Sequence, residues 1–380
     1  MLIQSISETK LDIIGDIHGE ISALENLLQH LGYGDAGEHP EGRKLVFVGD
    51  LVDRGENSWA VYKRVQACIE SGNAYCILGN HELNLLITDK TFGDNRPKIK
   101  PGNEWFHGLI ELVKKDDETS IQPQFLLRNN EERMALQNFL RTLPLVIEAP
   151  GIRIVHSCWN NCAIQALKED TRSPEVIHDH YERLCHQKIG AKVREHLSTY
   201  PETNPENLGV KDWLLSQDRG HPLRVFSELT LQNDNPIKVV TSGLEKPLEP
   251  NQEPYIAGKK IRYVQRDRWW TTYTDDAIVL CGHYWRTAPH PDFPTPIPLE
   301  DKRNIPPTFL PREGPFHWLG PKQNVMCIDY SVGKRFLERH HDATPGSSGS
   351  FLASLRYTRH HKGFSTQLIF DDGRIVDIQT

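Results

Sequence analysis

Near its start the chain reads Leu-Asp-Ile-Ile-Gly-Asp-Ile-His-Gly over residues 11–19. A short apolar run, typical of a buried β-strand, ends there in glycines, an aspartate and a histidine. The same kind of junction recurs as Leu-Val-Phe-Val-Gly-Asp-Leu-Val-Asp-Arg-Gly over 45–55 and as Ala-Tyr-Cys-Ile-Leu-Gly-Asn-His-Glu over 74–82. Ligands of open α/β sheets gather at the carboxyl ends of strands, so these three clusters are the first candidates for a functional site.

The spacing of apolar residues predicts how the remaining segments fold. Amphipathic stretches predict helices at 21–31, at 57–71, from 81 onward and at 174–186. Further apolar runs predict strands at 145–147, 152–155, 238–241, 277–281 and 325–329. The C-terminal runs are expected to form antiparallel pairs that close a second sheet, at 351–357, 367–370 and 374–378. The predicted fold class is α/β, a two-sheet β-sandwich flanked by helices, with helical and irregular insertions.

The 380 residues are long enough for one large domain, and we expect a single domain over 1–380. Residues 89–142 and 160–235 are polar and lack the strand pattern, so they are expected to be caps inserted into that domain. Ten prolines lie within residues 286–322 and exclude regular secondary structure there. A stiff loop near the mouth of a site is the expected result.

Composition limits the classes of partner. A formal net charge of -7 argues against sequence-independent binding of nucleic acid, which needs a basic surface. Residues 1–10 lack the basic start and apolar run of a signal peptide, and no apolar stretch is long enough to span a bilayer. We therefore expect a cytoplasmic protein without a membrane partner, and its oligomeric state is left open.

The seven cysteines are odd in number and irregularly spaced, and several lie inside apolar runs. This usage favours buried free thiols in a reducing compartment over disulfides. A metal shared by Cys158 and Cys162 is the less favoured alternative, because their spacing is not that of a usual zinc site.

Two later strands also end in histidine, as Val155-His156 and Gly282-His283. Any one of these polar residues alone is most simply a turn or surface residue. Together, aspartates brought to one place without a cation would bury like charges, so a metal site explains the joint pattern better. Carboxylate and amide oxygens mixed with imidazoles suit manganese, iron, zinc or magnesium. A shared carboxylate would hold two ions about 3.5–4 Å apart, as in binuclear phosphate-processing sites.

The three motifs resemble those of the calcineurin-like metallophosphoesterases, in the order that this superfamily uses. Within the superfamily they are similar to the phosphoprotein-phosphatase branch, which includes Ser/Thr phosphatases, bacterial relatives that act on phosphoproteins, and symmetrical dinucleoside tetraphosphatases. The resemblance covers about residues 10–88, with weaker matches at 152–157, 278–283 and 325–333. It implies a metal-dependent phosphatase, a hydrolase of phosphoric ester bonds with two divalent ions, of which manganese is favoured over iron, zinc and magnesium.

The resemblance also implies the metal ligands. Two residues would bind the first ion, one would bridge, and three would bind the second: in chain order Asp16, His18, Asp50, Asn80, His156 and His283. Asn80 would also contact the substrate. Glu82 is expected to support the ligands from outside rather than to take part in catalysis.

The catalytic residues follow from the same resemblance. His81 would protonate the leaving oxygen and would be oriented by Asp53, and Arg54 would hold the phosphate through its planar fork. Part of this case is independent, because Asp53 and Arg54 closely follow the bridging carboxylate and His81 directly follows a ligand. The expected reaction is attack on phosphorus by a metal-bridging hydroxide.

The chain departs from the family after two of the ligands. Ser157-Cys158-Trp159 and Tyr284-Trp285-Arg286 are bulkier than the residues usual there, and Arg286 could add a second phosphate contact. The other phosphate-binding arginine of the family has no clear counterpart. Candidates are Arg262, Arg266 and Arg268, although the run 262–270 also fits a solvated edge strand with stacked cations.

The expected function is hydrolysis of phosphate monoesters, on phosphoproteins or small phosphorylated molecules. One alternative is hydrolysis of dinucleoside polyphosphates, for which Trp159, Trp285 and the proline-rich loop could form a base pocket. A phosphatase of polynucleotide ends fits the acidic net charge less well. A catalytically inert binding module would have lost a ligand, Asp53 or His81, and all of them are present.

Overall fold

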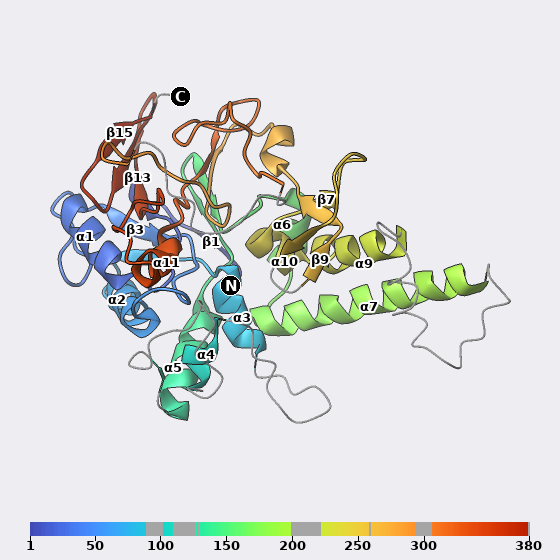
Figure 1. Cartoon of the computed structure of the whole chain (residues 1–380). Coiled ribbons are helices and arrows are strands. Elements are labelled where there is room, and N and C mark those ends of the chain that lie inside the picture. Colours follow the sequence, from blue (N-terminus) through green and yellow to red (C-terminus); the bar gives the residue numbers. More distant parts are fainter. Residues whose placement is uncertain are drawn as a thin grey trace.

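The computed structural model of the chain describes residues 1–88, 102–108, 126–127, 129–198, 222–257, 260–293 and 306–378. Two main sheets lie at the centre of this part of the chain (Figure 1). The first sheet has the strand order β15 (Ile375–Asp377), β14 (Gly363–Phe370), β13 (Ala353–His360), β2 (Lys10–Ile14), β3 (Lys44–Phe47) and β4 (Ala74–Cys76). The second sheet has the order β1 (Ile3–Ser5), β5 (Val146–Ala149), β6 (Ile152–Val155), β11 (Ile278–Cys281) and β12 (Val325–Cys327). The predicted α/β fold with two sheets is confirmed.

The strands that carry the motifs are buried on both faces. Val46 of β3 belongs to the apolar core between the sheets, together with Ile154 of β6 and Leu280 of β11. The alternate residues Leu45 and Phe47 belong to a second core, which includes the apolar face of α1. A strand covered on both sides reads as a continuous apolar run, which is why these segments were recognisable in the sequence.

Helices α1 (Ile21–Leu31) and α2 (Ser58–Glu70) lie beside the first sheet, and α11 (Arg335–His340) lies near them (Figure 1). The bounds of α1 are as predicted, because its leucines recur at helical spacing and Gly32 ends it at φ 88°. On the other side lie α6 (Asn161–Lys168), α7 (Pro174–Ser198), α9 (Pro222–Asn233) and α10 (Pro236–Ser242). Among the described residues, no helix combines the length and the apolar character that crossing a bilayer would need.

Two sequence predictions about secondary structure are wrong. Residues 238–241 were expected to be a strand but lie in helix α10. Its first turn is fixed by the side chain of Asn235, which accepts from the Ile237 N–H at 3.2 Å, and by Pro236 at the first helical position. A short β-branched run of this kind does not by itself distinguish a strand from a buried helix.

The second wrong prediction concerns the C-terminal strands, which do not close the second sheet. Strand β13 pairs antiparallel with β2, from Ser354 opposite Ile14 to Thr358 opposite Lys10. Strands β14 and β15 continue from β13, so the C-terminus extends the first sheet. Strand β13 thus hydrogen-bonds to the edge of β2 that is not paired with β3.

The predicted caps are only partly described. Within 89–142 the described residues form α4 (Glu104–His107) and α5 (Asn130–Thr142), and residues 89–101, 109–125 and 128 lie outside the description. Within 160–235 they form α6, α7 and α9, and residues 199–221 lie outside it. The division into one domain with two caps remains a prediction.

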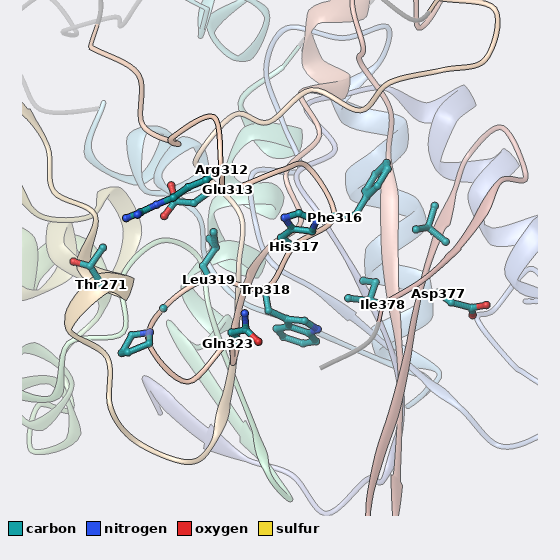
Figure 2. A pocket seen from close by; sticks show the side chains of 13 residues that line it. Thr271, Arg312, Glu313, Phe316, His317, Trp318, Leu319, Gln323, Asp377 and Ile378 are labelled. Carbon is teal, nitrogen blue, oxygen red and sulfur yellow. The ribbon is translucent and has the colours of Figure 1, made fainter.

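The described part of the proline-rich loop, 286–293 and 306–322, contains no helix or strand beyond isolated bridges, as predicted. Its later residues line a pocket of about 830 Å³ against the last strand (Figure 2). The lining includes Arg312, Phe316, His317, Trp318 and Ile378. None of the predicted site residues lines this pocket, so this part of the loop borders a separate cavity; residues 294–305 lie outside the description.

All seven cysteines are free thiols, and six of them are buried. The prediction of free thiols is confirmed, and only Cys162 is exposed. Among the described residues, neither Cys158 nor Cys162 belongs to a group that could hold a metal ion.

A buried ion pair joins β2 to its neighbours. Arg43, which is 3% exposed, donates from Nε and Nη2 to the fully buried carboxylate of Asp12, at 2.9 Å each. The same Nη2 donates to the carbonyl oxygens of Leu11 and Tyr357, at 2.6 and 2.9 Å. Arg356 approaches Asp12 from β13 at 3.0 Å. The pair therefore connects β2 to β13 at a point where unpaired charge would be costly.

The substitution Arg43→Met is expected to lower the free energy of unfolding by about 3 kcal/mol, because it leaves Asp12 with Arg356 as its remaining cation. Urea denaturation followed by circular dichroism measures this change. Arg172→Met, which breaks the exposed pair with Asp170, is the matched control and should have no measurable effect. Equal stability of the two variants would contradict the role given to Arg43.

Candidate metal centre

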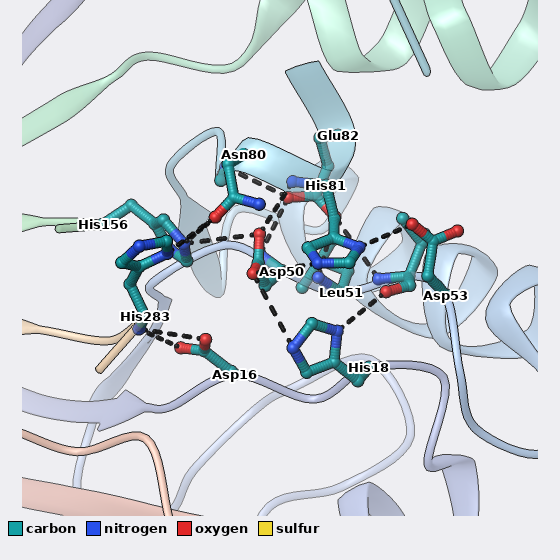
Figure 3. A network of polar contacts seen from close by, with 12 residues as sticks. Asp16, His18, Asp50, Leu51, Asp53, Asn80, His81, Glu82, His156 and His283 are labelled. Carbon is teal, nitrogen blue, oxygen red and sulfur yellow. Dashed lines mark hydrogen bonds and ion pairs between the residues drawn. The ribbon is translucent and has the colours of Figure 1, made fainter. Parts of the chain in front are cut away.

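The ends of strands from both sheets meet at one place. Strands β2, β3 and β4 are parallel, as are β6, β11 and β12, so their carboxyl ends share one side of each sheet. The six predicted ligands follow five of these strands and form one polar network (Figure 3): Asp16, His18, Asp50, Asn80, His156 and His283. Segments that are far apart in the sequence therefore supply one site.

Asp50 occupies the middle of this network. Its carboxylate forms one group of close ligand atoms with His18 and His81 and a second group with His156 and His283. Within each group the ligand atoms lie within 4.8 Å of one another. Asp50 Oδ2 lies 3.7 Å from His18 Nε2, and Oδ1 lies 3.4 Å from His156 Nε2. A carboxylate with one oxygen toward each group has the position that a bridging ligand requires.

Asn80, at the start of α3 (Asn80–Ile87), completes the second group. Its Oδ1 lies 3.2 Å from His156 Nε2 and 2.8 Å from His283 Nδ1. The exchanged orientation of the amide would instead donate to both imidazoles and to the carbonyl oxygen of Thr241. With Oδ1 inward, one amide oxygen and two imidazole nitrogens point at the same region, which is the arrangement that suits a cation.

The histidine tautomers fit metal binding. His156 Nδ1 lies 2.7 Å from the carbonyl oxygen of Val48, and His18 Nδ1 lies 3.1 Å from that of Val52. An imidazole that donates from Nδ1 leaves the lone pair of Nε2 free to bind a metal. His18 Nε2 is buried and has no hydrogen-bond partner, so a cation would satisfy an atom that the protein leaves without one. The residues present therefore fit two metal ions.

The charges of the site lead to the same conclusion. Burial and the nearby carboxylates of Asp329 and Asp50 raise the pKa of Asp16 well above its usual range. Burial and the charge of Arg54 lower the pKa of His18 well below its usual value, which favours the neutral imidazole that metals bind. Carboxylates that disfavour one another's ionisation are the groups that a cation stabilises.

Asp16 is joined to the network by the backbone N–H of His283. The N–H of His283 donates to its Oδ2 at 3.0 Å and to its Oδ1 at 3.3 Å. The preceding residue, Gly282, lies so close that a Cβ there would be 1.9 Å from Asp16 Oδ1. Asp16 is not part of either three-residue group around Asp50. Its predicted role as a ligand of the first ion therefore remains a prediction.

His81 and Asp53 form a second feature, at the edge of the site. His81 Nδ1 lies 2.6 Å from Asp53 Oδ2, and the His81 side chain is 18% exposed. Burial lowers the pKa of His81, but the charges of Asp50 and Asp53 outweigh it and raise that pKa above its usual value. Asp53 also accepts from Asn103 Nδ2 at 2.9 Å and from Trp105 Nε1 at 2.6 Å. These two partners come from the first predicted cap, where the sequence showed no motif.

Glu82 supports the loop after β3, as expected. Its fully buried carboxylate accepts from the N–H groups of Asp50 and Leu51 at 2.8 Å each, and from that of Gly79 at 3.0 Å. Burial and the charge of Asp50 raise the pKa of Glu82 to about 7. Glu82 thus orients Asp50 from outside the two groups of ligand atoms.

Strained backbone is concentrated at this site. Of the eight described residues other than glycine that have a positive φ, five are predicted site residues. They are His18, Asp50, Asp53, Arg54 and His283, at φ between 49° and 73°. Each such conformation costs about 1–3 kcal/mol and persists where the surrounding structure enforces it. The strain is therefore independent support for a functional site here.

Arg54 and Arg286 have different surroundings. The guanidinium of Arg54 lies 4.5 Å from the ring centre of Trp285. Arg286 is 4% exposed and donates to the carbonyl oxygens of Cys327 at 3.2 Å and Gly314 at 2.6 Å. Because its guanidinium is bonded inside the fold, the structure gives no support to the predicted phosphate contact of Arg286.

The three other candidate arginines also have partners in the protein. Arg262 pairs with Glu245, and Arg268 approaches Glu313 at 3.8 Å. Arg266 donates to the carbonyl oxygen of His283 at 3.2 Å. None of these contacts joins an arginine to a ligand side chain of the metal centre.

One acidic residue of the site was missed. Asp329 is 1% exposed, and its Oδ2 has no hydrogen-bond partner, while Oδ1 accepts from the Ser331 N–H at 2.8 Å. It follows β12 at the same side of the second sheet as His156 and His283. It also ends the predicted strand 325–329, so the signal that identified the other clusters was present.

The sequence matches a known family over most of its length. The model of the calcineurin-like phosphoesterase family matches residues 9–286. The chain belongs to this family. Membership confirms the predicted fold, and the described residues include two groups of ligand atoms that could hold divalent metal ions.

Several bacterial relatives are similar over part of the chain. The asymmetrical bis(5'-nucleosyl)-tetraphosphatase PrpE of Oceanobacillus iheyensis is 36% identical over 146 residues, 38% of this chain and 56% of that protein. PrpE of a Geobacillus species is 51% identical over 152 residues, 38% of this chain and 55% of that protein. The matches thus span a little over half of the length of these relatives.

A solved structure, a cold-active protein-tyrosine phosphatase of a psychrophilic Shewanella, aligns with all of this chain and with 82% of that chain. The sequence identity is 13% and the TM-score is 0.42. At that score the likeness carries no conclusion about function.

The substitution Asp50→Asn is expected to weaken the binding of both metal ions together, because one carboxylate faces both groups of ligand atoms. The affinity for Mn²⁺ should fall by at least about tenfold. Metal content after dialysis and calorimetric titration with Mn²⁺ measure the change. Asp342→Asn, at an exposed position, is the control and should keep both ions. Loss of a single ion would assign Asp50 to one metal only.

Proposed function

We propose that this chain hydrolyses phosphate monoesters with two divalent ions held by Asp16, His18, Asp50, Asn80, His156 and His283. The main support is Asp50, whose carboxylate belongs to both groups of ligand atoms. Manganese is the proposed metal, with iron, zinc and magnesium as alternatives, because the ligands are hard oxygens and imidazoles.

Each part of the site has a step in this proposal. When bound, two divalent ions would supply Lewis acidity, which activates a water molecule and neutralises charge on the phosphoryl group. Arg54 holds the phosphate oxygens with its planar fork. His81, whose Nδ1 is bound to Asp53 at 2.6 Å, gives the proton at Nε2 to the leaving oxygen. The carboxylate of Asp53, 2.6 Å from Nδ1, favours the protonated imidazole that this role requires.

The proposed substrates are phosphoproteins or small phosphorylated molecules. A second candidate class is dinucleoside polyphosphates, which is supported by relatives named bis(5'-nucleosyl)-tetraphosphatases. A catalytically inert binding module is disfavoured, because all six proposed ligands and the pair of His81 and Asp53 are present. We also propose that the protein acts in the cytoplasm, where a reducing environment preserves its seven free thiols.

Hydrolysis of p-nitrophenyl phosphate tests the proposed function. The purified chain, stripped with a chelator, should be inactive and should regain turnover when Mn²⁺ is added. Titration of activity against Mn²⁺ should saturate at two ions per chain. An absence of turnover with manganese, iron, zinc and magnesium alike would favour the inert binding module.

The variant His81→Ala should keep both ions but lose about 10²–10⁴-fold in kcat, because the leaving oxygen would depart without a proton. The loss should be larger for phenyl phosphate than for p-nitrophenyl phosphate, since nitrophenolate is the better leaving group and needs the proton less. His361→Ala, at an exposed turn, is the matched control. An equal loss with both substrates, or a loss of bound metal, would show that His81 is not the general acid.

A further inference from the structure

Two cationic side chains lie against one indole ring beside the metal centre. Trp285 comes two residues after His283, and its ring centre is 4.5 Å from Cζ of Arg54 and 6.0 Å from Nζ of Lys334. Arg54 follows β3, whereas Lys334 ends the short helix η5 (Val332–Lys334), almost three hundred residues later. Attraction between cations and an aromatic face accounts for their positions at the ring. Two like charges held side by side also create a region that attracts an anion.

Lys334 belongs to a segment that directly contacts a proposed ligand. A Cβ added at Gly333 would lie 2.8 Å from His18 Cδ2, so the backbone before Lys334 packs on the His18 imidazole. Any other residue at 333 would push the two apart. Lys334 is therefore placed close to the first group of ligand atoms, although it lies outside the residues that the family model matches.

The segment that carries Lys334 is held firmly in place. Arg339, one helical turn further on in α11, donates to both carboxylate oxygens of Glu20, at 2.7 and 2.8 Å. Glu338 is fully buried and accepts from the N–H groups of Gly346 at 2.8 Å and Ser348 at 2.9 Å. These bonds tie α11 to the first βα loop and to the loop before β13. Because the backbone at Lys334 is already fixed, less conformational entropy would be lost there when a ligand binds.

We propose that Trp285 and Lys334, beside Arg54, form a second anion subsite, which binds the phosphate group next to the one that is hydrolysed. This inference rests on the proposed function, because the first phosphate must sit on the metal ions and Arg54. A monoester has one phosphate, which the metal ions and Arg54 would hold. A polyphosphate chain carries further negative charge away from the metals and toward Lys334. The substrate class that the subsite fits is therefore a nucleoside or dinucleoside polyphosphate.

The corresponding reaction is hydrolysis of a phosphoanhydride bond. The oxygen of water forms the new bond to phosphorus, and the bridging P–O bond breaks, with its electron pair going to the departing phosphate. That oxygen receives the proton from His81, the attacking water releases a proton to solvent, and His81 regains one from solvent. Nothing is oxidised or reduced. Lys334 and Arg54 would stabilise the negative charge that the departing phosphate carries.

Binding of inorganic phosphates provides a test that does not depend on turnover. Calorimetry on the metal-loaded chain, at fixed free Mn²⁺, compares orthophosphate with tripolyphosphate. The protein should bind tripolyphosphate more tightly than orthophosphate. Lys334→Gln should lower the affinity for tripolyphosphate about tenfold more than the affinity for orthophosphate, as expected for the loss of one charge-assisted contact. Lys362→Gln, at an exposed turn, should change neither. Equal effects of Lys334→Gln on both ligands, or none on either, would overturn the subsite.

Kinetics separate this inference from the proposed function. The ratio of kcat/KM for diadenosine tetraphosphate to that for p-nitrophenyl phosphate should fall about tenfold in Lys334→Gln, mainly through KM. Trp285→Leu should lower the same ratio, while Trp285→Phe should retain most of it, because a phenyl ring still attracts cations. A chain that hydrolyses p-nitrophenyl phosphate but not the tetraphosphate would overturn the subsite and leave the phosphoesterase intact. Failure with both substrates would instead contradict the proposed function.

Discussion

The structure depends on the convergence of buried carboxylates and imidazoles at the ends of parallel strands. Asp16, Asp50 and Asp329 are each no more than 2% exposed, and burial together with the charges of the other two raises the pKa of Asp16. In a protein interior such groups are unfavourable unless positive charge or hydrogen bonds compensate them. Strained backbone adds a further cost at Asp50 and at four other proposed site residues, His18, Asp53, Arg54 and His283. Two divalent ions would compensate for both, and they would also satisfy the unpartnered nitrogen of His18.

The sandwich explains how distant segments reach this point. Parallel strands in each sheet align their carboxyl ends, and the packing of the sheets brings the two sets of ends together. Residues of the first cap and of the C-terminal segment then contact side chains of the site. Trp105 binds Asp53, and Gly333 packs on His18. The site is therefore built from most of the chain, although its ligands come from short motifs.

Local features of the fold could be predicted from the sequence, whereas pairing between distant strands could not. The bounds of α1 follow from the spacing of its leucines and from Gly32, which are local signals. The position of β13 beside β2 depends on which strand edge is unpaired, and no residue near 353–360 indicates which edge that is. The run 238–241 is β-branched in part, and its helical state is decided by the cap at Asn235. Short apolar runs therefore remain ambiguous until their contacts are known.

The same distinction applies to the site. The positions of His81 and Asp53 could be inferred because both adjoin proposed ligands in the sequence. The contact of Asn103 with Asp53 could not, because Asn103 lies in a segment without a motif. Arg286 shows the limit of adjacency: it is three residues from His283, yet its guanidinium is bonded to Gly314 and Cys327. Sequence gives proximity along the chain, but the direction of a side chain depends on packing.

Anomalous diffraction from crystals grown with Mn²⁺ tests the central claim most directly. The account predicts two peaks, one on each side of the Asp50 carboxylate, with His18 near one and Asn80, His156 and His283 around the other. A single peak, or peaks distant from Asp50, would contradict a binuclear centre bridged by this residue.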